Sequence, residues 1–293
     1  MKTVVVTGAD QLLGYHLMRE LSRDNYVVGI SLKEPPDLPP GTFHQKCAIT
    51  SYSKLESLLQ EIKPSVVLNA ADFDDTEKCE DQPGKAFDLN VKSVFYLARL
   101  SSLLRFKLVH FSTDLVFDGH SGPYEERDVT GPLNFYGDTK LQAEDIVQYL
   151  VQEYLLVRTS MVYGDGSTTH QDFIRRLLKK LESGVPTGEV VDQWSTPTFA
   201  GDVAEITTAL LDQDLVGLYH VAGPDFVSRN YYAHAIADFF GYERHLIKLT
   251  TSHFVGKKAT IPERGGLRSI KLKAVLGYAP NGISEGLQAY ERR

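Results

Sequence analysis

The chain begins with short apolar runs that alternate with longer segments in which apolar residues have helical spacing. Residues 3–7 form a β-branched run that ends at Gly8, and Leu13, Leu17 and Leu21 then follow at the period of a helix. The segment 34–41 contains four prolines and is expected to be a loop. Further strands are predicted at 26–32, 44–49, 65–69, 107–112 and 154–159. Helices are predicted at 54–62, at 84–105, and around Tyr136 and Lys140 as far as about residue 151.

This alternation predicts an α/β fold of the Rossmann type, a doubly wound parallel sheet with helices on both faces and a smaller C-terminal substrate lobe. Ligand sites in such sheets lie at the carboxyl ends of the strands. Beyond residue 163 the pattern loosens, with helices expected at 173–181, 202–211 and 231–240 and strands at 189–191 and 218–221. We therefore predict a dinucleotide-binding domain at 1–160, to which later segments return, and a lobe at 161–293 that is mainly substrate-binding.

Composition narrows the choice of partners. The net charge of −7 over 293 residues offers no basic field for nucleic acid. Cys47 and Cys79 are far apart, and the nine histidines lack metal-ligand spacing, so neither a disulfide framework nor a metal site is expected. We find neither a cleavable leader nor a membrane-spanning apolar run, and we expect a cytoplasmic protein that starts at Met1.

The turn after the first strand is a candidate dinucleotide site. Gly8 and Gly14 occupy the first and third places of a glycine-rich turn, whose backbone N–H groups bind pyrophosphate at a helix N-terminus. The middle place holds Gln11, followed by Leu12, so a side chain lies where the phosphate normally passes. Gln11 either weakens cofactor binding or donates its own amide to phosphate. Taken alone, the turn is equally consistent with a tight turn of no catalytic purpose.

The ends of the next two strands bear on the choice of cofactor. Ser31 and Lys33 stand where an enzyme that prefers NAD usually has an acidic residue, which favours NADPH over NADH without excluding NADH. Lys33 could also simply point into solvent. Ala70 and Ala71 are small enough for a cofactor to lie against them, although close helix packing explains them equally well.

Tyr136 and Lys140 form the only Tyr-x-x-x-Lys pair in the chain. Residues four apart share one face of a helix, so the Lys140 ammonium can reach the Tyr136 phenol and stabilise its ionised form. A phenol with an ordinary pKa near 10 needs such help to act as an acid–base catalyst at neutral pH.

Two blocks extend this pair, one at residues 111–119 beginning Phe111-Ser112-Thr113-Asp114 and one at residues 131–141 containing Tyr136-Gly137-Asp138-Thr139-Lys140. With them the chain resembles the extended short-chain dehydrogenase/reductase family, and within it the dTDP-4-dehydrorhamnose reductases. Supporting matches over nearly the whole chain lie at 67–71, 157–163, 197–198 and 217–223.

The resemblance implies specific roles. Tyr136 would donate a proton, Lys140 would bind the nicotinamide ribose and lower the phenol pKa, and Thr113 would hydrogen-bond the substrate oxygen. Asp114 would face sugar hydroxyls, or else cap a turn. Lys78 aligns near the substrate but is equally well explained as a surface charge.

Several positions depart from the subgroup. Met161 stands at a substrate position where Trp is common, and Leu115 replaces a common Tyr. Tyr15 replaces an acidic residue linked to metal-supported dimerisation, and Ala48 replaces an Asp near adenine. The sugar pocket is therefore expected to differ from the prototype.

The resemblance implies NAD(P)H-dependent reduction of the 4-keto group of a nucleotide-linked 6-deoxy sugar, as in the conversion of dTDP-4-dehydrorhamnose to dTDP-L-rhamnose. Two alternatives stay open: a non-catalytic dinucleotide-binding regulatory subunit, and a nucleotide-sugar epimerase or dehydratase. Leu115 argues against a dehydratase, because it cannot act as an acid or base. The expected partner is a nucleotide sugar, and a homodimer is left open.

Overall fold

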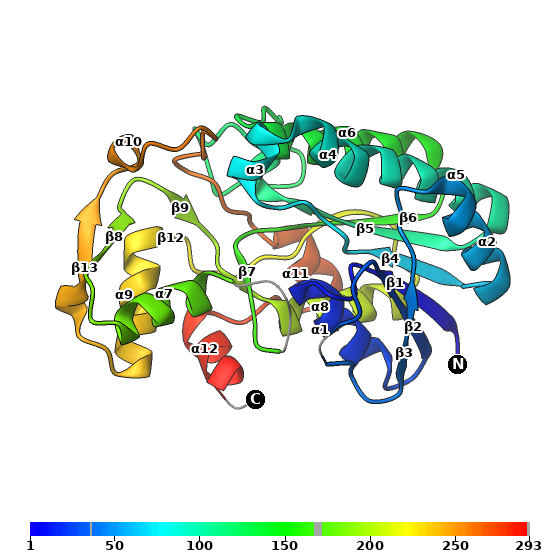
Figure 1. The fold of residues 1–293 in the computed structure, drawn as a ribbon, viewed down its shortest axis with the longest axis horizontal. Helices are drawn as coiled ribbons and strands as arrows, with labels where there is room; N and C mark the ends of the chain where they lie inside the picture. Colours follow the sequence, from blue (N-terminus) through cyan, green and yellow to red (C-terminus); the bar gives the residue numbers. More distant parts are fainter. Residues whose placement is uncertain (36, 167–171, 292–293) are drawn as a thin grey trace.

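A seven-stranded parallel sheet forms the centre of the computed structural model, which describes residues 1–35, 37–166 and 172–291. The strand order is β11-β6-β5-β4-β1-β2-β3, and every neighbouring pair is parallel. This confirms the predicted fold class (Figure 1). The strands are β1 (Thr3–Thr7), β2 (Tyr26–Ser31), β3 (Thr42–Lys46), β4 (Val66–Asn69), β5 (Lys107–Thr113), β6 (Tyr154–Thr159) and β11 (Gly217–His220).

Helices cover both faces of the sheet (Figure 1). One face carries α2 (Tyr52–Ile62), α5 (Ser93–Leu104) and α6 (Phe135–Leu150), and the other carries α1 (Leu12–Leu21), α8 (Ala200–Asp212) and α11 (Ile270–Leu276). Because alternate strand residues point to opposite faces, Val5 packs in one core while Val4 and Val6 pack in the other. Burial on both sides explains why these strands are continuous apolar runs.

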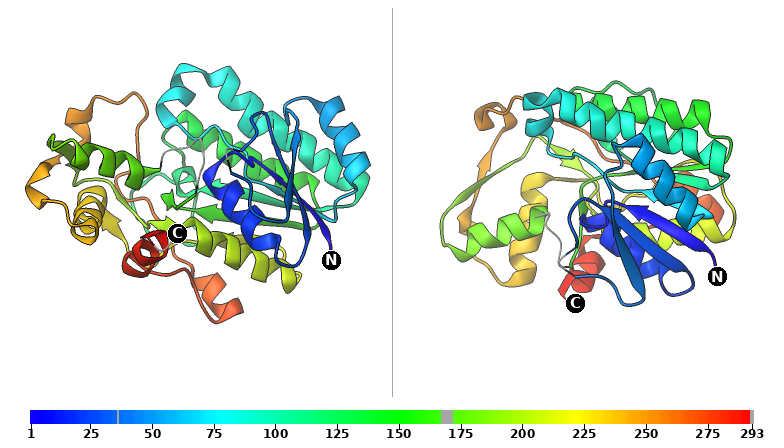
Figure 2. Two further views of the ribbon diagram at one scale, coloured as in Figure 1. Left: turned by 60° about the horizontal axis from the view of Figure 1, so that its bottom comes forward. Right: turned by 45° about the vertical axis from the view of Figure 1, so that its right-hand side comes forward.

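A smaller lobe lies beside the sheet (Figure 2). It has its own core, which includes Phe173, Tyr232 and Ile236. The chain returns from this lobe to the sheet, since β11 pairs with β6 and α8 packs against α1. The division at residue 160 stays a prediction. The remaining elements of this part of the chain are β7 (Val162–Tyr163), α7 (Phe173–Glu182), β8 (Thr187–Val190), β9 (Trp194–Ser195), β10 (Thr198–Phe199), β12 (Val227–Ser228), α9 (Arg229–Phe240), η3 (Arg244–Leu246), β13 (Ile247–Thr250), α10 (Ser252–Val255) and α12 (Ile283–Glu291).

The prediction of a single α-helix at 84–105 is wrong in one respect, because a π-helical turn interrupts the α-helix. Between α4 (Pro83–Phe87) and α5 the backbone makes a π-helical turn, η1 (Asp88–Lys92). Asn90 lies in this turn, and its amide contacts the backbone of Phe73 and the hydroxyl of Thr139. A π-helical turn commonly marks a functional site, and here it directs a buried amide at the loop after β4.

A buried ion pair ties α6 to the sheet. Glu144 on α6 is fully buried and accepts two hydrogen bonds from Arg158 on β6, at 2.8 and 2.6 Å. The pair fixes the helix that carries Tyr136 and Lys140 against the strand beside it.

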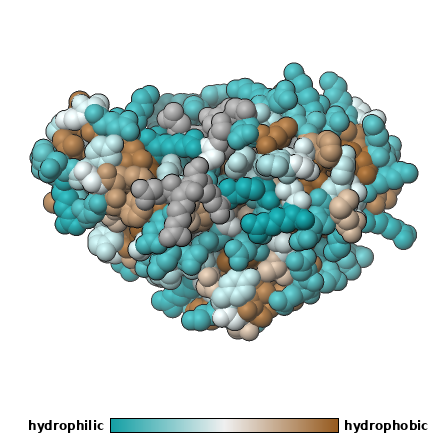
Figure 3. All heavy atoms as spheres, turned by 90° about the horizontal axis from the view of Figure 1, so that it is seen from below, coloured by the Kyte–Doolittle hydropathy of each residue, from teal (hydrophilic) through white to brown (hydrophobic). Residues whose placement is uncertain are grey.

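Seen from below the view of Figure 1, the surface is mainly hydrophilic, with separate hydrophobic patches (Figure 3). Within the described residues, no helix combines the length and apolarity that crossing a membrane requires.

Candidate active site

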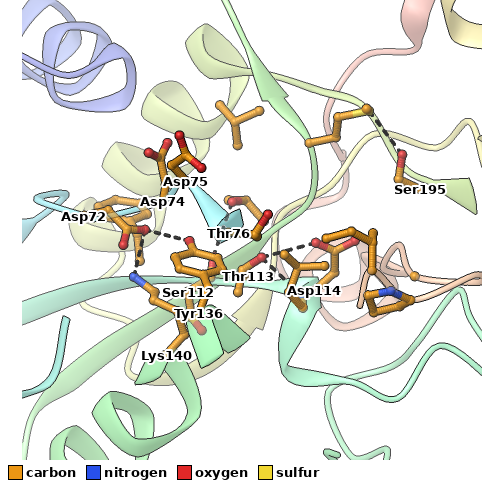
Figure 4. Close-up of a pocket in the computed structure, with 18 of the residues that line it drawn as sticks. Asp72, Asp74, Asp75, Thr76, Ser112, Thr113, Asp114, Tyr136, Lys140 and Ser195 are labelled. Carbon is orange, nitrogen blue, oxygen red and sulfur yellow. Dashed lines mark hydrogen bonds and ion pairs between the residues drawn. The ribbon is translucent and has the colours of Figure 1, made fainter. Parts of the chain in front are cut away.

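A cleft of about 640 Å³ opens at the carboxyl ends of the central strands, between the sheet and the lobe. It is the end of the sheet at which a parallel α/β fold places its ligands. Residues of the sheet region and of the lobe line it, among them Gln11, Leu12, Ala70, Asp72, Thr113, Asp114, Tyr136, Lys140, Met161, Trp194 and Lys257. The cleft therefore brings together most of the site residues predicted from the sequence (Figure 4).

Tyr136 and Lys140 lie on one face of α6, as their spacing predicts. Asn134 caps this helix by accepting a hydrogen bond from the Gly137 N–H, at 2.8 Å, so Tyr136 lies in the first turn. Both side chains meet a residue that sequence reasoning missed. The Tyr136 hydroxyl donates to Asp72 Oδ2 at 2.7 Å, and Lys140 Nζ donates to the same oxygen at 3.1 Å (Figure 4).

The surroundings of Tyr136 favour its neutral phenol. Burial, followed by the negative charges of Asp72 and Asp74, holds the pKa of Tyr136 well above its ordinary value. The Asp72 carboxylate lies beside the phenol and shares the Lys140 ammonium. That Lys140 lowers the pKa of Tyr136 stays a prediction.

Thr113 and Asp114 lie where β5 ends. Thr113 Oγ1 accepts from the Leu115 N–H at 3.2 Å and donates to Asp114 Oδ1 at 3.3 Å. Asp114 Oδ2 accepts from Ser160 Oγ at 2.6 Å and from the Gly266 N–H at 2.8 Å. Burial raises the pKa of Asp114 in spite of these hydrogen bonds. Asp114 therefore lines the cleft and also ties the end of β5 to Ser160 and Gly266. Its contact with sugar hydroxyls stays a prediction.

The turn between β1 and α1 has the close packing that a dinucleotide turn needs. Gly8 has φ of 70°, and a Cβ there would lie 2.7 Å from Ala71 N and 2.8 Å from Ala70 C and O. Gly14 packs directly against the Gly8 carbonyl. Leu12 begins α1 and lines the cleft, so the N-terminus of that helix faces the space where phosphate would bind.

Gln11 uses both ends of its amide on Asp72. Nε2 donates to the Asp72 carbonyl at 2.7 Å, and Oε1 accepts from the Asp72 N–H at 3.0 Å. Gln11 has φ of −104°, so the turn needs no glycine at this place for backbone reasons. In this structure the amide holds the loop after β4 and keeps one N–H of Nε2 in reserve, so donation to phosphate stays a prediction.

Replacing Gly8 with alanine is expected to destabilise the protein by about 2–5 kcal/mol and to weaken dinucleotide binding. The cost combines a left-handed backbone at a residue with a Cβ and a clash with the β4 loop. Urea unfolding and dinucleotide titration measure both effects. Gly41→Ala is the matched control, because Gly41 has φ of 77° with open space around it. Equal losses in the two variants would show that the packing against Ala70 and Ala71 is unimportant.

The other predicted cofactor residues lie partly at the cleft and partly at the end of β2. Ala70 lines the cleft, and Ala71 lies next to it with its N–H donating to Thr7 Oγ1. Ser31 is buried at the end of β2, where it hydrogen-bonds the Lys33 carbonyl and His44 Nε2. Lys33 is exposed beside it. Their roles toward a cofactor stay predictions.

Of the predicted substrate residues, Met161 lines the cleft, whereas Lys78 is not among the residues that line it. Met161 has φ of 44°, a left-handed conformation that is uncommon for a residue other than glycine, and Ser195 Oγ contacts its sulfur at 3.2 Å. Lys78 pairs with Asp75 at 2.8 Å, and 60% of its side chain is exposed, as expected for a surface charge.

Sequence reasoning also missed a group of cations on the lobe side of the cleft. Arg176, Arg229 and Lys257 line this wall, and Arg229 pairs with Glu189 at 3.1 Å. Burial and then the charge of Arg229 lower the pKa of Lys257. Asp72, Asp74 and Asp75 also line the cleft, and Glu77 accepts hydrogen bonds from the N–H groups of Lys258 and Ala259, next to Lys257. Within the described ranges, no cluster of three or more His, Cys, Asp or Glu side chains could hold a metal ion.

Comparisons with known proteins identify the family. The model of the RmlD substrate binding domain matches residues 1–292. The chain belongs to this family. It is therefore related to the dTDP-4-dehydrorhamnose reductases within the extended short-chain dehydrogenase/reductase superfamily, which confirms the resemblance stated from the sequence.

Named relatives of this RmlD-family chain include enzymes and a subunit of an enzyme. The chain is 32% identical to a probable low-salt glycan biosynthesis reductase of Haloferax volcanii, covering 98% of this chain and 96% of that protein. It is 32% identical to a dTDP-4-dehydrorhamnose reductase of Mycobacterium tuberculosis, with 85% and 79% covered. It is 29% identical to the methionine adenosyltransferase 2 subunit beta of Rattus norvegicus, with 94% and 82% covered.

A solved structure shares the whole fold. The dTDP-4-dehydrorhamnose reductase of Bacillus anthracis, crystallised in complex with NADP, superposes with a TM-score of 0.89 at 24% identity, covering 99% of both chains.

Proposed function

We propose that this RmlD-family protein reduces the 4-keto group of a nucleotide-linked 6-deoxy sugar, with dTDP-4-dehydrorhamnose as the first substrate to try. One observation carries the proposal: Tyr136, Lys140 and Thr113 line a single cleft that also reaches the helix N-terminus after the Gly8 turn. The reductase names of the relatives at 32% identity support it.

The side chains have complementary tasks in this reaction. When bound, a reduced nicotinamide supplies the hydride. Tyr136, whose hydroxyl carries its proton in the structure, donates that proton to the substrate oxygen. Thr113 lies at the end of the adjacent strand and hydrogen-bonds the same oxygen. Lys140 supplies positive charge beneath the phenol and has N–H groups left for a ribose, since an ammonium has three donors.

The walls of the cleft suit a nucleotide sugar. The diphosphate of such a substrate needs cationic partners, and Arg176, Arg229 and Lys257 line the lobe side. Met161 lies at the wall between the lobe and the reacting end, next to Ser195. We propose that Met161 takes the place of the aromatic residue that contacts the substrate in the prototype.

We propose NADPH as the preferred reductant, with NADH as a weaker one. Lys33 is exposed at the carboxyl end of β2, where a cation favours a 2′-phosphate. A cytoplasmic location and a homodimer stay predictions from the sequence.

The test follows the near-ultraviolet absorbance of NADPH in the presence of enzymatically prepared dTDP-4-keto-6-deoxy sugar. We expect substrate-dependent oxidation of NADPH that is faster than that of NADH, with the sugar product identified by mass spectrometry. A panel of UDP- and GDP-linked 4-keto sugars controls for the choice of nucleotide. Tight NADPH binding without turnover of any 4-keto sugar would contradict the reductase.

A second candidate is a non-catalytic dinucleotide-binding subunit. It is favoured by the 29% identity to a protein named as a subunit of methionine adenosyltransferase 2. The engagement of Tyr136 and Lys140 by Asp72 is also compatible with a site that no longer turns over. The same assay separates the two functions, because a subunit of this kind binds the dinucleotide and leaves it unchanged.

A further inference from the structure

We propose that Asp72 is a positioning residue that keeps Tyr136 in its protonated, proton-donating form, and that Gln11 holds Asp72 in place to do so. The catalytic consequence rests on the proposed reductase function. The effect of Asp72 on the protonation of Tyr136 does not depend on that function, because it needs only the folded protein.

The contact geometry specifies which form of the phenol is favoured. Asp72 Oδ2 accepts from the Tyr136 hydroxyl at 2.7 Å and from Lys140 Nζ at 3.1 Å. A carboxylate has no proton to give in its ionised form, so this hydrogen bond exists only while Tyr136 keeps its own proton. Ionisation of Tyr136 would place its phenolate oxygen 2.7 Å from the Asp72 carboxylate oxygen, so two anions would face each other. The second oxygen, Oδ1, is shielded from solvent and has no hydrogen-bond partner among the described residues.

Two amide side chains hold the loop that carries this carboxylate. Gln11 bonds both the N–H and the carbonyl of Asp72. Asn90 does the same for Phe73, accepting from its N–H at 2.9 Å and donating to its carbonyl at 3.3 Å. Consecutive residues are thus tied to the β1–α1 turn and to the π-helical turn η1. Such pairing fixes the backbone of Asp72 and so limits how far its carboxylate can move away from the phenol.

The charges around the phenol act in the same direction, with one exception. The loop after β4 contributes the negative charges of Asp72 and Asp74. Nearby on α3 (Thr76–Asp81), the Glu80 carboxylate accepts a hydrogen bond from the Phe135 N–H. Lys140 on α6 is the opposing cation. Burial raises the pKa of Cys79 to about 12, so its thiol is neutral near pH 7.

The groups on β5 complete the surroundings. Burial holds the pKa of His110 well below its ordinary value, so its imidazole is neutral, and Asp114 is engaged with Ser160 and Gly266. Burial and the two carboxylates of the β4 loop together hold the pKa of Tyr136 well above its ordinary value.

This arrangement favours the protonation state of Tyr136 that reduction uses. In that direction the proton leaves Tyr136 Oη for the substrate oxygen as the carbonyl carbon gains hydride, and solvent then returns a proton to the phenolate. The phenolate left beside Asp72 is unfavourable, so reprotonation is strongly driven. Oxidation of the alcohol would need that phenolate as a base from the start. We therefore expect reduction to persist to higher pH than an unassisted phenol allows.

The test measures the phenol directly, without substrate. Isotope-labelled tyrosine gives an NMR signal from the carbon bonded to the phenol oxygen, and Tyr136→Phe assigns it. In Asp72→Asn and Asp72→Ala, the titration midpoint of Tyr136 should fall by about one pH unit or more, because a facing negative charge is removed. Asp74→Asn should give a smaller fall, and Gln11→Ala a fall between zero and that of Asp72→Ala. An unchanged midpoint in both Asp72 variants would overturn the proposal.

Activity provides the second measurement and separates this proposal from the proposed function. The high-pH limb of the reduction rate should move down by the same amount in Asp72→Asn as the NMR midpoint does. A lowered NMR midpoint with no turnover of any keto sugar would refute the reductase while supporting the role of Asp72. Turnover with an unshifted high-pH limb would refute the role of Asp72 and leave the reductase standing.

Discussion

Tyr136→Phe is expected to lower the turnover of a keto sugar by about two to four orders of magnitude, because it removes the proton donor for the developing alkoxide. The ring itself is kept, and it packs in a small cluster with Cys79 and Ala86, so the fold should tolerate the change. Dinucleotide binding should be nearly unchanged, since the turn at Gly8 and the Lys140 ammonium remain. Stopped-flow oxidation of NADPH measures the chemical step, and fluorescence titration measures binding.

A second tyrosine on the same helix is the control for this variant. Tyr149 is 89% exposed on α6, so Tyr149→Phe should leave turnover at the wild-type level. If Tyr136→Phe retained a third or more of the wild-type rate, another group would have to be the proton donor.

Glu144→Ala is expected to reduce the free energy of unfolding by about 3–5 kcal/mol, because it leaves the Arg158 guanidinium buried without its carboxylate. Arg158 is 4% exposed and lies over the Phe117 ring at 5.0 Å. Its neighbour His220 is a neutral imidazole near pH 7, because burial lowers the His220 pKa to about 3, so it cannot replace the lost carboxylate. Urea unfolding, followed by fluorescence, measures the loss.

Two further variants sharpen this prediction. The double variant Glu144→Leu/Arg158→Met removes both buried charges. It should recover much of the free energy of unfolding that Glu144→Ala loses. Lys92→Gln disrupts the solvent-exposed pair with Asp88 and should leave the unfolding midpoint where it is, because exposed pairs contribute little. A Glu144→Ala protein as stable as the wild type would mean that Arg158 finds another partner or solvent.

The sheet was predictable because its signal is local and repeated. The central strands are apolar runs of the kind that burial on two faces requires, whereas the edge strand β3 is polar and largely exposed. Glycine, proline or polar residues mark the turns. Gly8, Thr113, Tyr136 and Lys140 follow strands or open helices, so their meeting at one edge follows from the alternation itself. The order of strands and helices alone therefore predicts that these residues lie close together.

The missed features depend on contacts between distant residues. The π-helical turn is set by Asn90, whose partners Phe73 and Thr139 lie in other elements. Asp72 follows Ala70 and Ala71 directly after β4, and that position was a usable signal for a cleft residue. What the sequence could not supply was that the carboxylate reaches Tyr136, because that depends on how Gln11 fixes the loop.

The late return of the chain to the sheet restricts how the protein can be divided. A fragment ending at 160 would lack α8, which covers α1, and β11, which borders β6. It would leave Leu17 and Leu21 on α1 facing water and one edge strand unpaired, a surface prone to self-association. We therefore expect that residues 1–160 do not fold autonomously, and that a circular permutant or an inserted reporter needs its break elsewhere.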